Sequence, residues 1–524
     1  MIHLFSWRVG ESTRQLQYKT NIVTEKLVFR LFLSLFIITF SFLPHSVNAD
    51  APPKHEVRAV WLTTIGGIDW PHNYANTPSA AERQKQELRS ILDKLQHANI
   101  NTVLLQTRIR ATAIFPTTQA SGNEPWDGCL SGKPGKSPGY DALQFAIDEC
   151  HARGMYIHAW VVTIPVGKWN SYGCRTLRER HGSLVMRIGD EGFMNPADTR
   201  TATYLADYCR DLARRYDLDG IHLDYIRYPE TMRNMPKGDE GRRNITRIVR
   251  TIHDAVKNEK PWVRLSCSPI GKHDDTRRFW SSGWNARSRV CQDAKEWMRC
   301  GLMDMEFPMM YFKGKHFYPF VVDWHEGCYG REVVPGLGIY FLHPREKDWQ
   351  LTDITRQLYV SRSLDMGFCL FRSKFFTDNT KGLYDFVSNH FCPYPALLRP
   401  LSSSFLPPSA PGCLVVSRSD KGVSLHWEGA LDRSDGDRLT YNVYASPAYP
   451  VDTDDARNLM LANISAGDVF VPHTSSPTGM MYYAVTATDR YCNESVARQE
   501  PATAKGSQKI VRPGSWWVTH PLGR

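Results

Sequence analysis

The sequence predicts an α/β protein: a (β/α)8 TIM barrel followed by a small all-β, immunoglobulin-like sandwich. Two observations predict this fold class. Between residues 57 and 390, short apolar segments alternate eight times with amphipathic segments. Beyond residue 412, short runs of alternating polarity are separated by turn residues, as in a sandwich of antiparallel sheets. A chain of 524 residues is long enough for two or three such domains.

Each barrel strand is predicted from a short apolar run, and each helix from an apolar stripe of helical spacing. The strands are expected at residues 57–63, 102–108, 155–163, 220–226, 262–270, 303–311, 333–341 and 367–372. The helices are expected near 79–97, with Ser79 as the cap, and near 140–153, 199–216, 241–258, 291–300, 320–326, 352–365 and 381–390. A doubly wound open sheet is the alternative, but it commonly has a GxGxxG turn after its first strand. Residues 64–71 read TIGGIDWP, so the closed barrel is favoured.

Composition changes predict the domain boundaries. Residues 1–49 are interpreted as a leader and signal peptide, because an apolar run at 31–43 follows Lys26 and Arg30, and small residues precede Asp50. The alternative is an uncleaved N-terminal anchor. The barrel is assigned to 50–398, a Pro- and Ser-rich linker to 399–411, the sandwich to 412–503 and a C-terminal tail to 504–524. The protein is therefore expected in the periplasm, at the cell surface or outside the cell, without a stable membrane span after cleavage.

Composition and charge exclude several classes of function. The net charge of +10 is spread over the whole chain without runs of like charge, so no nucleic-acid partner is expected. The 12 cysteines form no CxxC, and neither HxH nor HExxH occurs, so no metal and no cofactor are predicted. A disulfide between Cys129 and Cys174, both in expected loops, is one option. The pattern does not indicate an oligomeric state.

The fourth strand carries the clearest candidate for chemistry. Residues 219–229 read DGIHLDYIRYP, and a period of two places Gly220, His222 and Asp224 on one face. If that face is the barrel lumen, Asp224 lies at the C-terminal ends of the strands, where barrel enzymes have their active sites. A carboxylate there suits catalysis, and a structural ion pair with Arg227 is the alternative.

Glycoside hydrolysis usually needs a second carboxyl group. Glu124, on the loop after the second strand, and Glu306, on the sixth strand, are the predicted candidates. Asp304 lies earlier in the sixth strand and is interpreted as structural.

Aromatic and polar side chains are expected around the same end of the barrel, where aromatic faces stack on sugars. The predicted substrate-binding residues are Asp69, Trp70, Arg108, Trp126, His158, Trp160, His222, Tyr228 and Tyr311. For the two histidines, hydrogen-bonded positions inside the barrel are the alternative.

These segments resemble the glycosyl-hydrolase-like 10 family of bacterial exported proteins over about residues 55 to 395. The matching stretches are EVRAVWLTTIGGIDWP (56–71), NTVLLQTRIRATAIFP (101–116), EPWDGCLSGKPGKSPGYDALQFAIDECHARGMYIHAW (124–160), DGIHLDYIRYP (219–229), LSCSPIG (265–271) and MDMEFPMMYF (303–312). The resemblance implies a (β/α)8 barrel that hydrolyses glycosidic bonds, in some members those of bacterial cell-wall glycan. It also implies roles for Asp224, for Asp69 with Trp70, and for Glu124 with Trp126. After residue 412, three strands resemble a fibronectin type III domain.

The chain departs from the family at two strands. On the sixth, residues 308–312 read PMMYF where many members have Pro-Gln-aliphatic-Tyr-Trp, and Glu306 stands at a position that is often apolar. The seventh strand, PGLGIYF at 335–341, lacks the terminal Glu of the large retaining clan.

We therefore expect an exported glycoside hydrolase that acts on a polysaccharide by carboxylate acid/base catalysis. A non-catalytic glycan-binding protein on the same scaffold is the alternative. An esterase or deacetylase is a third hypothesis, but the GxSxG at 135–139 (GKSPG) does not directly follow an expected strand, as a serine nucleophile of that motif would.

Overall fold

The computed structural model describes residues 51–236, 239–276, 279, 284–401, 406–436, 438–472 and 480–501. The predicted signal peptide and C-terminal tail lie outside these residues. Met1–Ala51 and Pro52–Arg524 are separate units, and the fold described below belongs to the second.

The main sheet consists of parallel strands whose two ends meet. Its strands are β1 (Arg58–Leu62), β2 (Thr102–Ile109), β4 (Tyr156–Val162), β8 (Gly220–Asp224), β9 (Arg264–Cys267), β10 (Met305–Glu306), β11 (Glu332–Val333), β12 (Gly336–Leu337) and β13 (Phe368–Leu370). They are ordered β11-β10-β9-β8-β4-β2-β1-β13-β12, and the short β3 (Thr112–Ala113) pairs antiparallel with β2. Only Val334 and Pro335 separate β11 from β12. The Val334 amide donates to Glu306 on one side, and the Cys369 amide donates to Pro335 on the other. The sheet therefore has the parallel order and the joined ends of the predicted barrel.

Two predicted strands are much shorter in the structure. The sixth was expected over 303–311 and the seventh over 333–341. Pro308 and Pro335 have no amide N–H to donate to a neighbouring strand, and they interrupt regular pairing. An isolated parallel bridge between Met309 and Gly336 continues the contact beyond the prolines.

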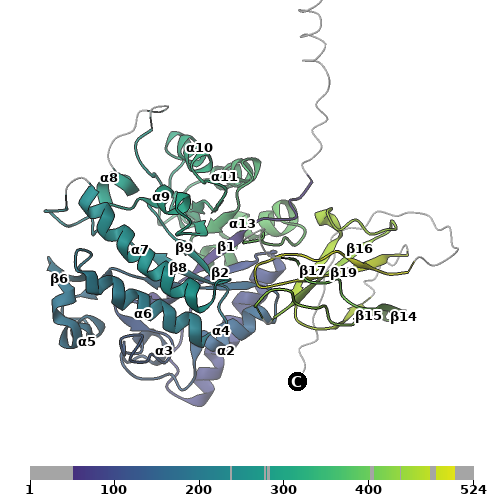
Figure 1. The fold of residues 1–524 in the computed structure, drawn as a ribbon, viewed down its shortest axis with the longest axis horizontal. Coiled ribbons are helices and arrows are strands. Elements are labelled where there is room, and N and C mark those ends of the chain that lie inside the picture. Colours follow the sequence, from purple (N-terminus) through teal and green to yellow (C-terminus); the bar gives the residue numbers. More distant parts are fainter. Residues whose placement is uncertain are drawn as a thin grey trace, which may run out of the picture. The chain divides into compact units, whose positions relative to one another are not determined.

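Helices follow the strands and cover the outside of the sheet (Figure 1). The longer ones are α2 (Pro78–His97), α4 (Ala142–His151), α5 (Tyr172–His181), α6 (Thr199–Arg215), α7 (Asp239–Glu259), α10 (Tyr318–Glu326) and α11 (Leu351–Ser363). Shorter ones are η1 (Ile65–Gly67), α3 (Gly128–Ser131), η2 (Gly182–Leu184), α8 (Ala286–Val290), α9 (Ala294–Arg299), η3 (Gly314–His316), η4 (Ile339–Leu342), α12 (Ser373–Thr377), η5 (Thr380–Gly382), α13 (Leu383–Phe386) and η6 (Val387–Phe391), and η7 (Ala456–Asn458) lies in the C-terminal region instead. Thr77, rather than the predicted Ser79, caps α2, because its hydroxyl accepts the Ala80 amide at 3.2 Å.

The connection from β4 to α6 contains a small sheet that the sequence pattern did not predict. It is antiparallel and consists of β5 (Pro165–Lys168), β7 (Glu191–Met194) and β6 (Val185–Ile188). Since it begins where β4 ends, this insertion lies on the side of the barrel where the candidate site is expected.

Two apolar layers hold the barrel together. Alternate side chains such as Trp61, Leu104 and Phe307 form a cluster inside the ring of strands. Their neighbours along the strands, such as Leu105 and Leu223, pack outward against the helices. The alternation therefore shows which strand residues point into the lumen.

Two antiparallel sheets follow the barrel. One contains β14 (Leu414–Arg418), β15 (Gly422–Trp427) and β18 (Asp468–Pro472). The other contains β17 (Leu459–Ile464), β16 (Thr440–Ser446), β19 (Tyr482–Thr488) and β20 (Arg498–Gln499). Residues of both sheets, among them Trp427, Val443 and Val485, share one buried core. The predicted all-β region is thus present, and its immunoglobulin-like type stays a prediction.

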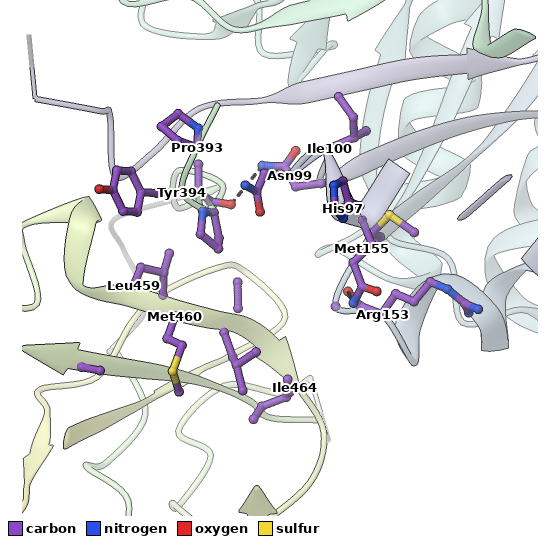
Figure 2. Close-up of a pocket in the computed structure, with 18 of the residues that line it drawn as sticks. His97, Asn99, Ile100, Arg153, Met155, Pro393, Tyr394, Leu459, Met460 and Ile464 are labelled. Atoms are coloured by element: carbon purple, nitrogen blue, oxygen red, sulfur yellow. Dashed lines mark hydrogen bonds between the residues drawn. The ribbon is translucent and has the colours of Figure 1, made fainter. Parts of the chain in front are cut away.

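These sheets contact the barrel near the N-terminal ends of its strands. The hydroxyl of Tyr156, at the start of β4, donates to Asn463 at 3.0 Å, and Asp217, just before β8, pairs with Arg438 at 3.0 Å. A cavity of about 430 Å³ lies between the two parts, and Figure 2 shows Leu459 and other residues from both sides of it. The opposite end of the barrel, where β8 ends at Asp224, is not part of this contact.

Two further findings bear on the sequence predictions. All 12 cysteines are free thiols, so Cys129 and Cys174 are not joined. In the part of the chain that the structure describes, no helix has the length and apolar character needed to cross a bilayer.

Candidate active site

Asp224 ends β8 and is surrounded by hydrogen-bond donors. Its Oδ2 accepts the indole N–H of Trp160 at 3.1 Å. Its Oδ1 accepts the Ser268 hydroxyl at 2.7 Å and the Tyr225 amide at 2.7 Å. An indole and an amide can only donate, so both oxygens of Asp224 act as acceptors.

The expected alternative for Asp224, an ion pair with Arg227, is not formed. Within the described ranges, no Lys, Arg or His side chain lies within ion-pair distance of Asp224. The Arg227 guanidinium instead lies over the Tyr225 ring, 3.5 Å from its centroid, with Nε 3.9 Å from Glu230 Oε2. Asp224 itself is half-buried. A carboxyl group without a counterion, partly open at the end of a barrel strand, suits a chemical role better than a structural one.

Four aromatic rings cluster around Tyr311, whose hydroxyl senses the charge of Asp224, and we call them the aromatic rim: Trp61, Tyr311, Tyr340 and Phe371. The Tyr311 ring lies 6.5 Å from Trp61, 5.9 Å from Tyr340 and 5.2 Å from Phe371, measured between centroids. Burial raises the pKa of Tyr311 well above its ordinary value, and Asp224 is among the nearby charges that add to the shift. Trp61 is buried, whereas the other three rings are partly exposed and can meet an apolar sugar face.

The two barrel histidines, His158 and His222, are buried in the barrel below the aromatic rim. The His222 ring contacts Ser266 Oγ through Nδ1 at 3.0 Å and accepts the Trp61 indole N–H through Nε2 at 3.2 Å. Burial lowers the pKa of His158 to about 4 and that of His222 well below its usual value. Both rings are therefore neutral near pH 7. His222 is thus a hydrogen-bonded histidine inside the barrel, as the alternative expects, whereas His158 is completely buried and neither of its ring nitrogens has a hydrogen-bond partner among the described residues.

Glu124, a predicted catalytic residue, is held in a buried ion pair. The Arg108 guanidinium donates from Nε to both carboxylate oxygens at 3.0 and 2.9 Å, and from Nη2 to Oε1 at 2.6 Å. The Tyr204 hydroxyl adds a bond to Oε1 at 2.8 Å. Arg108 also donates to two backbone carbonyls at the end of β4. This network occupies the side chains of both Arg108 and Glu124, which suits a structural role for Glu124, and its catalytic role stays a prediction.

Asp69 and Trp70 are likewise engaged inside the protein. Asp69 pairs with Arg372 and accepts the Thr63 amide and hydroxyl at 2.9 and 2.7 Å. Trp70 is fully buried, and its indole donates to the Gln84 carbonyl at 2.8 Å. Their burial argues against the direct substrate contact that the sequence predicted for them.

Glu306 points away from the lumen. Its neighbours Met305 and Phe307 belong to the cluster inside the barrel, so the Glu306 side chain faces the helix layer. It is completely buried and accepts the Cys267 thiol at 2.8 Å. Burial raises the pKa of Glu306 well above its ordinary value, so the group is a neutral acid. The structure therefore does not place Glu306 with Asp224.

The last two aromatic candidates also lie away from Asp224. Tyr228 is buried, and Asn244 donates to its hydroxyl at 2.9 Å. Trp126 packs, half-buried, against the layer between sheet and helices. Of the predicted substrate-binding residues, Trp160 and Tyr311 are the two that the structure brings to Asp224.

Several residues around Asp224 were not predicted as site residues. Ser268 follows β9 and lies two positions after Ser266, which also faces the lumen, so a period of two would have indicated it. Tyr340 follows β12, in the seventh strand region, and Phe371 follows β13, the eighth strand. Glu230, which hydrogen-bonds to Tyr225, lies one residue beyond the motif at 219–229.

No metal site is apparent around this carboxyl group. Among the residues that the structure covers, no three His, Cys, Asp or Glu side chains are grouped closely enough to hold a metal ion. The expected absence of a metal or cofactor stays a prediction.

Comparisons with known proteins place the chain among relatives of glycosyl hydrolases. Residues 56–240 match the model of the family described as glycosyl hydrolase-like 10. The chain is 25% identical over 515 residues to glycosyl hydrolase YngK of Bacillus subtilis (strain 168), covering 91% of this chain and 98% of that protein. It is 30% identical over 298 residues to glycosyl hydrolase DigH of Escherichia coli (strain K12), covering 49% of this chain and 65% of that protein. The matched family region contains β1 to β8 and therefore Asp224.

Among solved structures, alpha-L-fucosidase isoenzyme 2 from Paenibacillus thiaminolyticus aligns with a TM-score of 0.42 and 13% identity. The alignment covers 64% of this chain and 48% of that chain. We base no argument on this distant likeness, since the strand pairing itself defines the fold.

Proposed function

We propose that the protein is an exported glycoside hydrolase that cleaves O-glycosidic bonds of a polysaccharide, with Asp224 as the general base or nucleophile. The placement of Asp224 is the observation that carries this proposal. It ends a parallel strand, accepts three hydrogen bonds, and has no counterion among the described residues. The aromatic rim beside it supplies faces on which a sugar can stack.

The chemistry of this site follows from the donors around Asp224. Because both oxygens accept hydrogen bonds, the group can take a proton from water or attack the anomeric carbon. Trp160 and Ser268 fix the orientation of the carboxyl group, so little reorganisation is needed as charge develops. A second carboxyl group must then supply the proton to the departing oxygen.

For the substrate we propose bacterial cell-wall glycan, which the family resemblance implies for some members. The sequence similarity to glycosyl hydrolases of Bacillus subtilis and Escherichia coli supports the glycoside hydrolase class of the proposal. Export is proposed from the apolar run at 31–43 and the small residues before Asp50. The C-terminal sheets are proposed to form a fibronectin type III-like module with no chemistry of its own.

A non-catalytic glycan-binding protein is the second candidate. One observation favours it: the three other carboxyl groups predicted at the site have contacts elsewhere inside the protein. Glu124 and Asp69 form buried ion pairs, and Glu306 faces the helix layer. On this alternative the aromatic rim binds sugar and no bond is broken.

A glycan screen separates the two candidates. The chain from Asp50 onward is incubated with purified peptidoglycan glycan strands and with plant polysaccharides, and products are resolved by mass spectrometry. We expect new reducing ends from the peptidoglycan strands. Binding to these strands without any cleavage product, across the full panel and from pH 4 to 8, would favour the binding protein.

A further inference from the structure

The loop after β8 carries a second carboxyl group, Glu230, that one tyrosine connects to Asp224. The Tyr225 amide donates to Oδ1 of Asp224 at 2.7 Å, and the Tyr225 hydroxyl donates to Oε2 of Glu230. Tyr225 is half-buried and packs against the cluster inside the barrel. The bridge between the two carboxyl groups therefore lies at the same end of the barrel as the aromatic rim.

Tyr225 is held in an unusual backbone conformation. Its φ is +55°, in the left-handed region that bulky residues rarely adopt. This conformation is strained, and such residues cluster at active sites, where the surrounding structure holds them. Here the Arg227 guanidinium packs on the ring at 3.5 Å, and the hydroxyl is bound by Glu230. The loop thus binds Asp224 through the backbone amide of Tyr225 and Glu230 through its hydroxyl.

The hydrogen bonds distinguish the two carboxyl groups. Both Asp224 oxygens accept bonds, whereas Tyr225 engages one oxygen of Glu230. Burial raises the pKa of the Tyr225 hydroxyl above its ordinary value, so the phenol keeps its proton and acts as the donor in this bond. The Glu230 side chain is 37% exposed, so a substrate can reach it.

Building on the proposed hydrolase function, we propose that Glu230 is the proton donor that acts with Asp224. As the glycosidic C–O bond breaks, Glu230 gives its proton to the departing oxygen. Water then adds its hydroxyl group to the anomeric carbon, and its remaining proton goes to one of the two carboxyl groups. Water attacks either in the same step or after Asp224 has formed a covalent bond to the anomeric carbon, which this attack breaks. The sum is hydrolysis, with water as the one co-reactant.

Glu230→Gln tests this role against a purely structural one. The glycan strands that the wild type cleaves are compared with the 2,4-dinitrophenyl glycoside of the same sugar, whose leaving group needs no proton. We expect the variant to lose about 100-fold or more in kcat on the strands, as for other general acids. On the aryl glycoside it should stay within a few-fold of the wild type. The fall of kcat/KM at high pH should also disappear in the variant.

Controls separate the possible failures. Glu191→Gln, at an exposed position on β7, should change neither rate. Tyr225→Phe keeps the ring over Arg227 but removes the bond to Glu230, and should shift the high-pH limb without abolishing it. If Glu230→Gln cleaves the strands at the wild-type rate, or loses both substrates equally, the proton-donor role is overturned while the hydrolase proposal stands. A wild type that cleaves no glycan overturns both proposals.

Discussion

The ion pair between Arg108 and Glu124 permits a test of whether Glu124 is structural. Both side chains are almost completely buried, at 0% and 1% exposure, and three N–H···O bonds join them. Glu124→Gln leaves the guanidinium buried without a counterion. Breaking one partner of a buried pair costs about 3–5 kcal/mol. At about 2–4 °C per kcal/mol for domains of 150–250 residues, the unfolding midpoint should fall by roughly 5–15 °C in this larger barrel.

The assay combines thermal unfolding with hydrolysis of the glycan strands. Below its lowered midpoint, Glu124→Gln should retain wild-type kcat per folded molecule, because Arg108 and Tyr204 already engage the Glu124 carboxylate. A double variant, Arg108→Met with Glu124→Leu, should recover most of the lost stability, since removing both charges removes the unpaired ion. A Glu124→Gln protein that unfolds at the wild-type temperature but no longer hydrolyses the strands would refute this reasoning. Glu124 would then be a catalytic residue and not a structural one.

Three more substitutions test the site and its surroundings. Glu306 stays neutral in the folded state but ionises in the unfolded chain, so the wild type should lose stability as pH rises above about 4.3 toward the raised pKa. The stability advantage of Glu306→Gln should therefore grow from pH 5 to pH 8 in thermal unfolding, and a pH-independent difference would contradict this. Ser268→Ala removes a 2.7 Å hydrogen bond to Asp224, of a kind worth roughly 1.5–3 kcal/mol to the folded state, so the unfolding midpoint should fall by several degrees, and kcat should fall about 10- to 100-fold because the carboxyl group loses a donor that orients it. Tyr311→Ala removes part of the aromatic rim and should raise KM roughly three- to tenfold at near-constant kcat, whereas an unchanged KM would exclude sugar stacking there.

The barrel was predictable because its strands are buried on both faces. Such strands appear as continuous apolar runs, and eight of them alternate with helical patterns between residues 57 and 390. Two strands are shorter than predicted, because Pro308 and Pro335 have no backbone N–H to pair with a neighbouring strand. The pattern of apolar residues does not show where such a donor is missing. The sheet of β5, β6 and β7 was missed because its strands are short and have no clear apolar alternation.

The site was predictable where it depended on position within one strand. Asp224 and Trp160 follow from a period of two and from the rule that barrel sites lie at strand ends. The hydrogen-bond and ion-pair partners of side chains that are distant in the sequence were not predictable. Nothing in the spacing of Arg108 and Glu124 indicates a buried ion pair, and nothing around Trp70 indicates that Gln84 accepts its indole N–H.

The central claim is that Asp224 takes part in bond cleavage and not in holding the fold. The most direct measurement compares Asp224→Asn with the wild type in two assays on the same preparation: calorimetric binding of the glycan strands and release of reducing ends. We predict binding within a few-fold of the wild type and a loss of turnover of at least about 1,000-fold. Turnover within tenfold of the wild type, in a variant that is folded and binds the strands, would contradict the claim.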